Sequence, residues 1–86
     1  MYVITYRRSV KKELEKLGQA SRTAIVKKIL SLAADPRPAG CRKLRESQDL
    51  YRIRYGNYRI IYQIQDKTLI IVIIKVGHRK EIYRGL

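Results

Sequence analysis

The sequence predicts a small α+β protein in which one strand and two helices are followed by three further strands. Apolar residues recur at helical spacing in the first half of the chain, whereas in the second half they alternate or run continuously, as in strands. A connector with two prolines and a glycine separates the halves. We therefore expect a mostly antiparallel four-stranded sheet, in the order β-α-α-β-β-β with a short C-terminal segment, and a helical hairpin packed on one face.

The first half accounts for the first strand and both helices. Residues 2–6 are β-branched or aromatic and predict a short strand. Ser9 offers a hydroxyl that can cap the first helix, and Gly18 can adopt the left-handed conformation that ends it. A second helix is expected from about Ala20 to Ala34, because Asp35-Pro36 stops it. Its apolar stripe consists of Ala24, Ile25, Ile29, Leu32 and Ala33.

The second half accounts for the hairpin and the last strand. The basic connector 36–46 is expected to cross the surface without regular structure. Gly56-Asn57 is a two-residue loop of the type that joins hairpin strands, and Asp66-Lys67 is the next turn, with Gln65 opposite Thr68. The last strand is nearly continuously apolar, which favours a position in the middle of the sheet. The three expected strands are Tyr51–Tyr55, Tyr58–Gln65 and Thr68–Val76.

The charge balance points to an anionic partner. The 86 residues include 20 Lys or Arg and 7 Asp or Glu, a formal net charge of +13. Such a field favours nucleic acid, an anionic membrane surface or an acidic protein. We expect one domain over residues 1–86, a reducing cytoplasmic location because Cys41 is the single cysteine, and no membrane span, since the longest apolar run covers only Leu69 to Ile74.

Strand register predicts a cluster of arginines on one face of the sheet. If Gly56-Asn57 is a two-residue loop, Arg54 lies opposite Arg59. Residues on one face alternate with period two, and this face would carry Arg52, Arg54, Arg59 and Gln63. Like charges directly opposite each other are unfavourable, so a bound phosphate would explain the arrangement. The alternative is a solvated basic face.

The segment after the last strand could fold over these arginines. Gly77 allows the chain to bend, and His78, Arg79 and Tyr83 follow it. Taken alone, His78 is more often a surface or capping residue, and Tyr83 is more often a packing residue. Their expected convergence with the arginines makes both candidates for a catalytic site.

The sequence lacks the motifs that several common types of catalysis require. The acidic residues are scattered, which disfavours metal-assisted hydrolysis, and we expect no metal. The chain has no glycine-rich phosphate loop or dinucleotide fingerprint, so we expect no nucleotide cofactor. Attack of an RNA 2′-hydroxyl on its own phosphodiester needs only positioning, cationic charge stabilisation and groups that accept and donate a proton.

Three segments together resemble the RelE/ParE toxin superfamily, specifically the RelE-like mRNA interferases of toxin–antitoxin systems. They are Tyr51-Arg52-Ile53-Arg54, Gly56-Asn57-Tyr58-Arg59 and Gly77-His78-Arg79-Lys80-Glu81-Ile82-Tyr83. The resemblance implies a small sheet backed by a helical hairpin, and metal-free mRNA cleavage in the ribosomal A site by 2′-hydroxyl attack.

The resemblance also implies roles for individual residues. Arg52, Arg54 and Arg59 would bind phosphate, Arg79 would act on the leaving-group side, and Tyr83 would stack on a base or help activate the 2′-hydroxyl. Well-studied interferases have lysines at the first two positions, and arginine cannot serve as a general base. His78 is a candidate base by its ordinary pKa, although the resemblance does not assign it that role.

The partners implied by the resemblance are a cognate RelB-like antitoxin, expected to be acidic, and the ribosome with its mRNA and rRNA. Two alternatives stay open. One is a ParE-like inhibitor of DNA gyrase without nuclease activity, although such relatives generally lack the full arginine and tyrosine set. The other is a non-catalytic RNA-binding relative.

Overall fold

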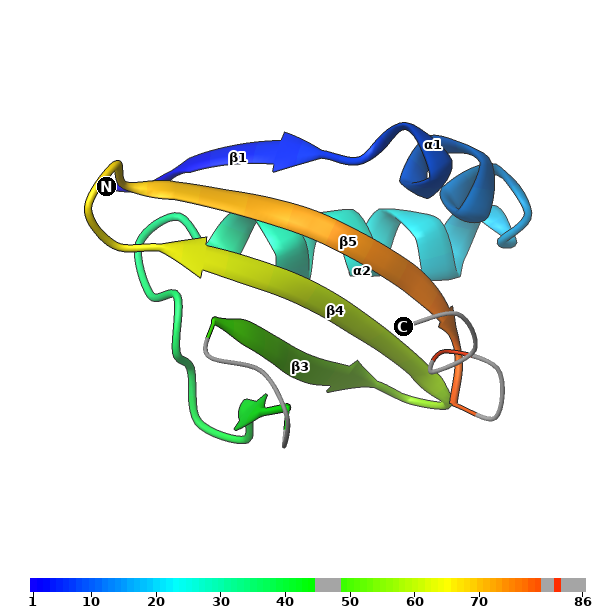
Figure 1. The fold of residues 1–86 in the computed structure, drawn as a ribbon. Helices are drawn as coiled ribbons and strands as arrows, with labels where there is room; N and C mark the ends of the chain where they lie inside the picture. Colours follow the sequence, from blue (N-terminus) through cyan, green and yellow to red (C-terminus); the bar gives the residue numbers. More distant parts are fainter. Residues whose placement is uncertain (45–48, 80–81, 83–86) are drawn as a thin grey trace.

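Two helices cover one side of a twisted sheet in the computed structural model, which describes residues 1–44, 49–79 and 82 (Figure 1). In those residues the elements are β1 (Val3–Tyr6), α1 (Arg8–Glu15), α2 (Gln19–Ser31), β2 (Arg42–Lys43), β3 (Leu50–Tyr55), β4 (Tyr58–Gln65) and β5 (Ile70–His78). The strand order is β1-β5-β4-β3-β2. Only β1 runs parallel to its neighbour among the described pairings. The predicted α+β class is confirmed, and β5 lies inside the sheet as expected.

The sheet has five strands rather than the expected four because part of the basic connector pairs with β3. Arg42 lies opposite Arg52, and Lys43 lies opposite Tyr51. The Leu44 N–H donates to the Leu50 carbonyl at 2.9 Å, which extends the contact. The connector therefore satisfies backbone groups on the outer edge of β3, a pairing set by tertiary contact rather than by local sequence.

The helix boundaries differ from the expected ones at both ends. α1 begins at Arg8 without a side-chain cap, so Ser9 lies inside the helix. Gly18 is extended, with φ −60° and ψ 152°, and precedes α2 instead of ending α1 in the left-handed region. α2 ends at Ser31 rather than near Ala34, and the Ala33 carbonyl accepts a hydrogen bond from the Tyr2 N–H at 2.8 Å. That contact couples the end of α2 to the start of β1.

The core lies between the helices and the sheet. The fully buried α2 residues Ile25 and Ile29, with Val10 of α1, pack against the inward-facing residues of β3, β4 and β5. The strand residues in this cluster are Ile53, Ile60, Tyr62, Ile64, Ile71, Ile73 and Val76. Burial of these branched side chains is the main stabilising contribution to a fold of this size.

The turn before β5 is longer than expected. Residues 66–69 all belong to it, so Gln65 lies opposite Ile70 rather than Thr68. Leu69 has a positive φ of 57°, and its carbonyl accepts a hydrogen bond from the Val3 N–H at 2.8 Å. Pairing with β1 thus holds Leu69 in a conformation that non-glycine residues seldom adopt.

A polar cluster anchors the connector to the far end of the sheet. The Arg37 guanidinium forms a salt bridge with the Asp66 carboxylate at 2.9 Å and donates to the Tyr51 hydroxyl at 3.2 Å. The Tyr2 hydroxyl donates to the same carboxylate at 2.5 Å. The buried Tyr62 donates its hydroxyl to the Pro36 carbonyl at 2.7 Å, and burial raises the pKa of that hydroxyl.

Replacing Asp66 with asparagine should make stability less dependent on pH. The Arg37 guanidinium and then the Tyr2 hydroxyl lower the pKa of the Asp66 carboxyl, so folding favours the ionised form. The carboxylate therefore stabilises the fold at neutral pH, and this contribution is lost as the pH falls through the lowered pKa, below about 3.9. Urea unfolding should show wild type more stable than Asp66→Asn at pH 7, with the gap closing as the pH falls through the lowered pKa of Asp66.

Asp35→Asn is the matched control, since it removes an exposed carboxylate that immediately precedes the connector. A gap between wild type and Asp66→Asn that persisted unchanged at the lowest pH would contradict the assignment.

Candidate nucleic-acid interface

One end of the sheet continues beyond its two outer strands. β1 pairs with β5 only from Ile70 to Ile73, and β2 pairs with β3 only at Tyr51 and Arg52. Beyond those points β5, β4 and β3 continue as a tip, which we define as residues 53–55, 58–61 and 75–78. A hollow of about 380 Å³ lies beside β5 and one of about 360 Å³ lies beside β3. The site residues that the structure describes lie on or next to this tip.

The arginine face, defined as Arg52, Arg54 and Arg59, lies on the side of the sheet away from the helices. The expected hairpin register is confirmed, with Arg54 opposite Arg59. Ile53 and Ile60, which alternate with these arginines, are in the core on the opposite side. Arg54 is exposed, Arg52 is half-buried and Arg59 is only 8% exposed. The arginine face therefore has a buried cation at its base and an exposed one at its rim.

Hydrogen bonds to the hairpin backbone direct the Arg59 side chain. Its Nη1 donates to the Tyr58 carbonyl at 3.1 Å and to the Gly56 carbonyl at 3.3 Å. A buried charge is costly unless it is hydrogen-bonded, and these carbonyls offset part of that cost. The guanidinium is therefore positioned before any ligand arrives, which is the condition for effective electrostatic catalysis.

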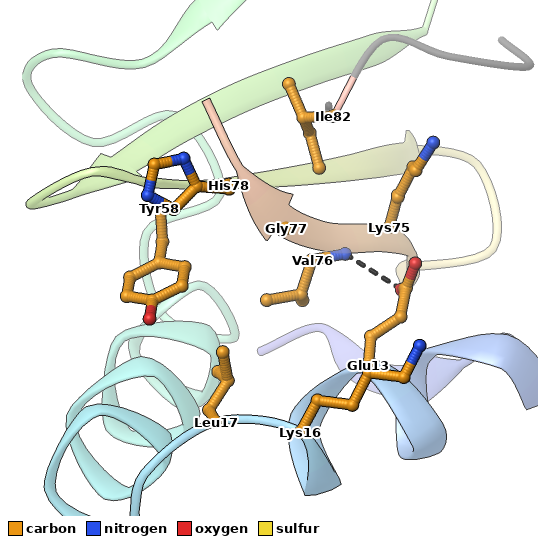
Figure 2. A pocket seen from close by; sticks show the side chains of 9 residues that line it. All are labelled: Glu13, Lys16, Leu17, Tyr58, Lys75, Val76, Gly77, His78 and Ile82. Carbon is orange, nitrogen blue, oxygen red and sulfur yellow. Dashed lines mark hydrogen bonds between the residues drawn. The ribbon is translucent and has the colours of Figure 1, made fainter. Parts of the chain in front are cut away.

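His78 does not lie on the arginine face. Figure 2 shows its imidazole above Tyr58, and the ring centroids are 5.7 Å apart in an edge-on arrangement. Tyr62 lies opposite Ile73 while Ile61 lies opposite Lys75, so Ile74 is the extra residue of a β-bulge. The bulge shifts the alternation of side chains, leaving Gly77 rather than His78 beside Arg59. The prediction from the sequence that His78 converges with the arginines is therefore wrong.

The backbone after β5 lies against the hairpin. The Arg79 N–H donates to the Asn57 carbonyl at 2.8 Å, which places this exposed residue at the tip. Ile82 is fully buried, and its Cδ1 lies 3.4 Å from the position that a Cβ on Gly77 would occupy. Figure 2 shows Ile82 on the side of β5 away from the helices. Tyr83 lies outside the described residues.

Sequence reasoning missed Lys75 of the tip and Glu13, which contacts the tip from α1. Lys75 lies opposite Ile61 on the same side of the sheet as Arg59. Lys75 interrupts an apolar run in the sequence, and this could have indicated that the strand exposes its side chains differently from that point on. Glu13 of α1 accepts a hydrogen bond from the Val76 N–H at 3.0 Å, which satisfies the edge of β5 beyond β1 (Figure 2). No local pattern pairs residues so far apart in the chain.

The described part of the chain offers neither a metal-binding cluster nor a membrane-spanning helix. No group of three or more His, Cys, Asp and Glu side chains there could hold a metal ion. No helix within those same residues has the length and apolar character needed to cross a membrane.

Fold and site together define a small basic α+β protein whose antiparallel tip carries the arginine face. The family described as the ParE toxin of the type II toxin–antitoxin system, parDE, matches residues 4–83. The chain belongs to the RelE/ParE toxin superfamily.

Individual relatives agree with this assignment. The chain is 34% identical to the mRNA interferase toxin RelE of Escherichia coli K12, with 95% of this chain and 90% of the relative covered. It is 31% identical to the toxin RelG of Mycobacterium tuberculosis, covering 96% and 97%. The structure of the archaeal RelE–RelB complex from Pyrococcus horikoshii matches with a TM-score of 0.81 at 31% identity, covering 91% and 94%. The isolated E. coli RelE toxin matches with a TM-score of 0.79 at 31% identity, covering 91% and 84%.

Proposed function

We propose that this protein is the toxin of a toxin–antitoxin module and an endoribonuclease that cleaves mRNA in the ribosomal A site. The observation that carries the proposal is the arginine face, where Arg54 lies directly opposite the buried Arg59. Guanidinium groups brought together in this way suit an anionic ligand, and the relatives with the same fold include proteins named mRNA interferases. The anion in this proposal is the scissile phosphodiester.

In the proposed reaction the RNA supplies its own nucleophile. The 2′-oxygen attacks the adjacent phosphorus, the bond from phosphorus to the 5′-oxygen breaks, and a 2′,3′-cyclic phosphate and a 5′-hydroxyl result. Negative charge builds up on the phosphorane oxygens in the transition state. Arg52, Arg54 and Arg59 bind the phosphate and stabilise that charge, because the planar guanidinium matches two phosphate oxygens. No step in this scheme requires a metal ion.

Proton transfer requires groups other than these three arginines, since arginine stays protonated. We assign Arg79 to the leaving-group side, where it stabilises charge or donates a proton to the 5′-oxygen. Tyr83 stacks on a base or helps to activate the 2′-hydroxyl. His78 is left out of this scheme because its ring lies against Tyr58 on the helix side.

The proposed partners, an antitoxin and the ribosome, are inferred from the net charge of the chain and from the complexes of its relatives. Relatives with this fold have been crystallised with RelB antitoxins, including those of E. coli and Pyrococcus horikoshii. We propose that a RelB-like acidic antitoxin binds this chain in the cytoplasm, favoured by the net charge of +13. The basic residues outside the arginine face would dock the toxin on rRNA through many weak phosphate contacts.

The chemistry predicts the ends of the cleaved mRNA. On translating ribosomes, the downstream fragment is expected to carry a 5′-hydroxyl, detectable because a polynucleotide kinase labels it without prior phosphatase treatment. A 2′-deoxynucleotide immediately upstream of the cut should abolish cleavage, because it removes the nucleophile. A downstream fragment with a 5′-phosphate would overturn the mechanism.

The family description names ParE, so a gyrase inhibitor is the second candidate. It predicts loss of DNA supercoiling by gyrase with intact mRNA. Supercoiling and primer-extension assays with the same preparation separate the two. If neither responds while rRNA binding persists, the chain is a non-catalytic RNA-binding relative.

A further inference from the structure

The hollow beside β3 carries three cations from three separate elements. Lys28 lies on α2, Arg42 on β2 and Arg54 on β3, and the remaining lining residues are Ala39, Gly40 and Ile53. The part of this lining that the structure describes includes no acidic side chain. A run of surface charge along one helix would be ordinary, but here the cations converge from distant parts of the sequence.

The backbone of β3 also opens towards this hollow. The Leu50 carbonyl accepts the Leu44 N–H, so even-numbered residues of β3 direct their backbone groups to the β2 side. β2 pairs no further than Arg52, and the N–H of Arg54 therefore faces the edge where the hollow lies. A backbone N–H beside guanidinium and ammonium groups is a favourable environment for an oxyanion.

The dimensions and rim of the hollow suit a phosphodiester. Its volume of about 360 Å³ is within the range of small-ligand sites. Gly40, with φ +89°, and Ala39 supply a rim with little side-chain bulk, so a sugar–phosphate backbone can approach closely. The guanidinium forks of Arg42 and Arg54 match phosphate oxygens in bidentate geometry, and a phosphodiester can accept hydrogen bonds from more than one of these cations.

We propose that this hollow is a second phosphate subsite, which binds a backbone phosphodiester of the same single RNA strand that lies on the arginine face. Arg54 belongs to both, because it lines the hollow and lies opposite Arg59. A strand crossing the edge of β3 would therefore have one phosphate on each side of Arg54. The inference rests on the proposed function, since it assumes that the arginine face binds RNA.

A matched pair of double variants tests the subsite. Lys28→Ala/Arg42→Ala removes two lining cations, whereas Lys27→Ala/Lys43→Ala removes two exposed cations of the same elements that do not line the hollow. Binding to a fully 2′-O-methylated single-stranded oligonucleotide, which cannot be cleaved by its own 2′-oxygen, would be followed by fluorescence anisotropy against salt. Thermal midpoints would establish that both variants are folded.

For the lining pair, the slope of log K against log[salt] is expected to become shallower by about 0.7 for one lost phosphate contact, with a clearly smaller change in the control pair. Equal slopes and affinities in both pairs would overturn the subsite. Unchanged RNA binding with weakened binding of poly-L-glutamate by the lining pair alone would also overturn it, and would point to an acidic protein partner.

The failure of the subsite can be told apart from the failure of the proposed function. If wild type fails to cleave mRNA while the lining pair loses RNA affinity selectively, the function is wrong and the phosphate subsite stands. If cleavage depends on the arginine face while both pairs bind RNA alike, the function stands and the subsite is wrong.

Discussion

Replacing Arg59 with alanine is expected to lower the rate constant for mRNA cleavage on the ribosome by about 10²–10³-fold. Removing one preorganised donor to a developing oxyanion has an effect of this size in other enzymes. Arg59 fits that description because it is only 8% exposed and its guanidinium is held by the Gly56 and Tyr58 carbonyls. Single-turnover cleavage of a defined A-site codon is the measurement, since it reports the chemical step.

The effect must be separated from loss of charge and loss of fold. Arg8→Ala, at the exposed start of α1, removes the same charge and should leave the rate nearly unchanged. Arg59→Lys keeps the charge but loses the fork and should recover only part of the rate. A folded Arg59→Ala variant with wild-type cleavage would eliminate the arginine face as the catalytic site.

Replacing Ile29 with alanine is expected to lower the free energy of unfolding by about 2–5 kcal/mol. Ile29 is fully buried in the core cluster between α2 and the sheet, so the change leaves a cavity as well as removing apolar contact. Small domains have a total stability of about 5–15 kcal/mol, and the loss is a large share of it. Urea unfolding followed by circular dichroism measures the difference.

The neighbouring residue provides the control. Leu30 is 55% exposed on the same helix, and Leu30→Ala should change stability by no more than about 0.5 kcal/mol. Similar losses in both variants would mean that α2 does not pack on the sheet through Ile29.

The arginine face could be predicted from the sequence because it depends only on a tight turn and on the alternation of side chains along adjacent strands. Gly56-Asn57 closes a two-residue hairpin, which sets Arg54 opposite Arg59, and side-chain alternation then places Arg52 on the same face. The buried stripe of α2 followed from helical periodicity in the same way, since Ile25 and Ile29 are one turn apart.

The surroundings of the arginine face depended on contacts between distant segments. The bulge at Ile74 places Gly77, rather than His78, on the same face of the sheet as Arg59. A single extra residue within a continuous apolar run does not change the sequence pattern, so the bulge could not be predicted from it. β2 forms because the edge of β3 offers unpaired backbone groups, which brings Arg42 to the hollow beside Arg54.

Local turn geometry and periodicity specify the two helices, the four expected strands, the hairpin register and the arginine face, so these could be predicted from the sequence. The neighbours of the arginine face depend on the assembled fold, which places Gly77 rather than His78 next to Arg59 and brings Arg42 and Lys28 to the edge of β3. Pairing between strands and packing of the connector are non-local, so their free energies depend on the assembled fold rather than on neighbouring residues in the chain.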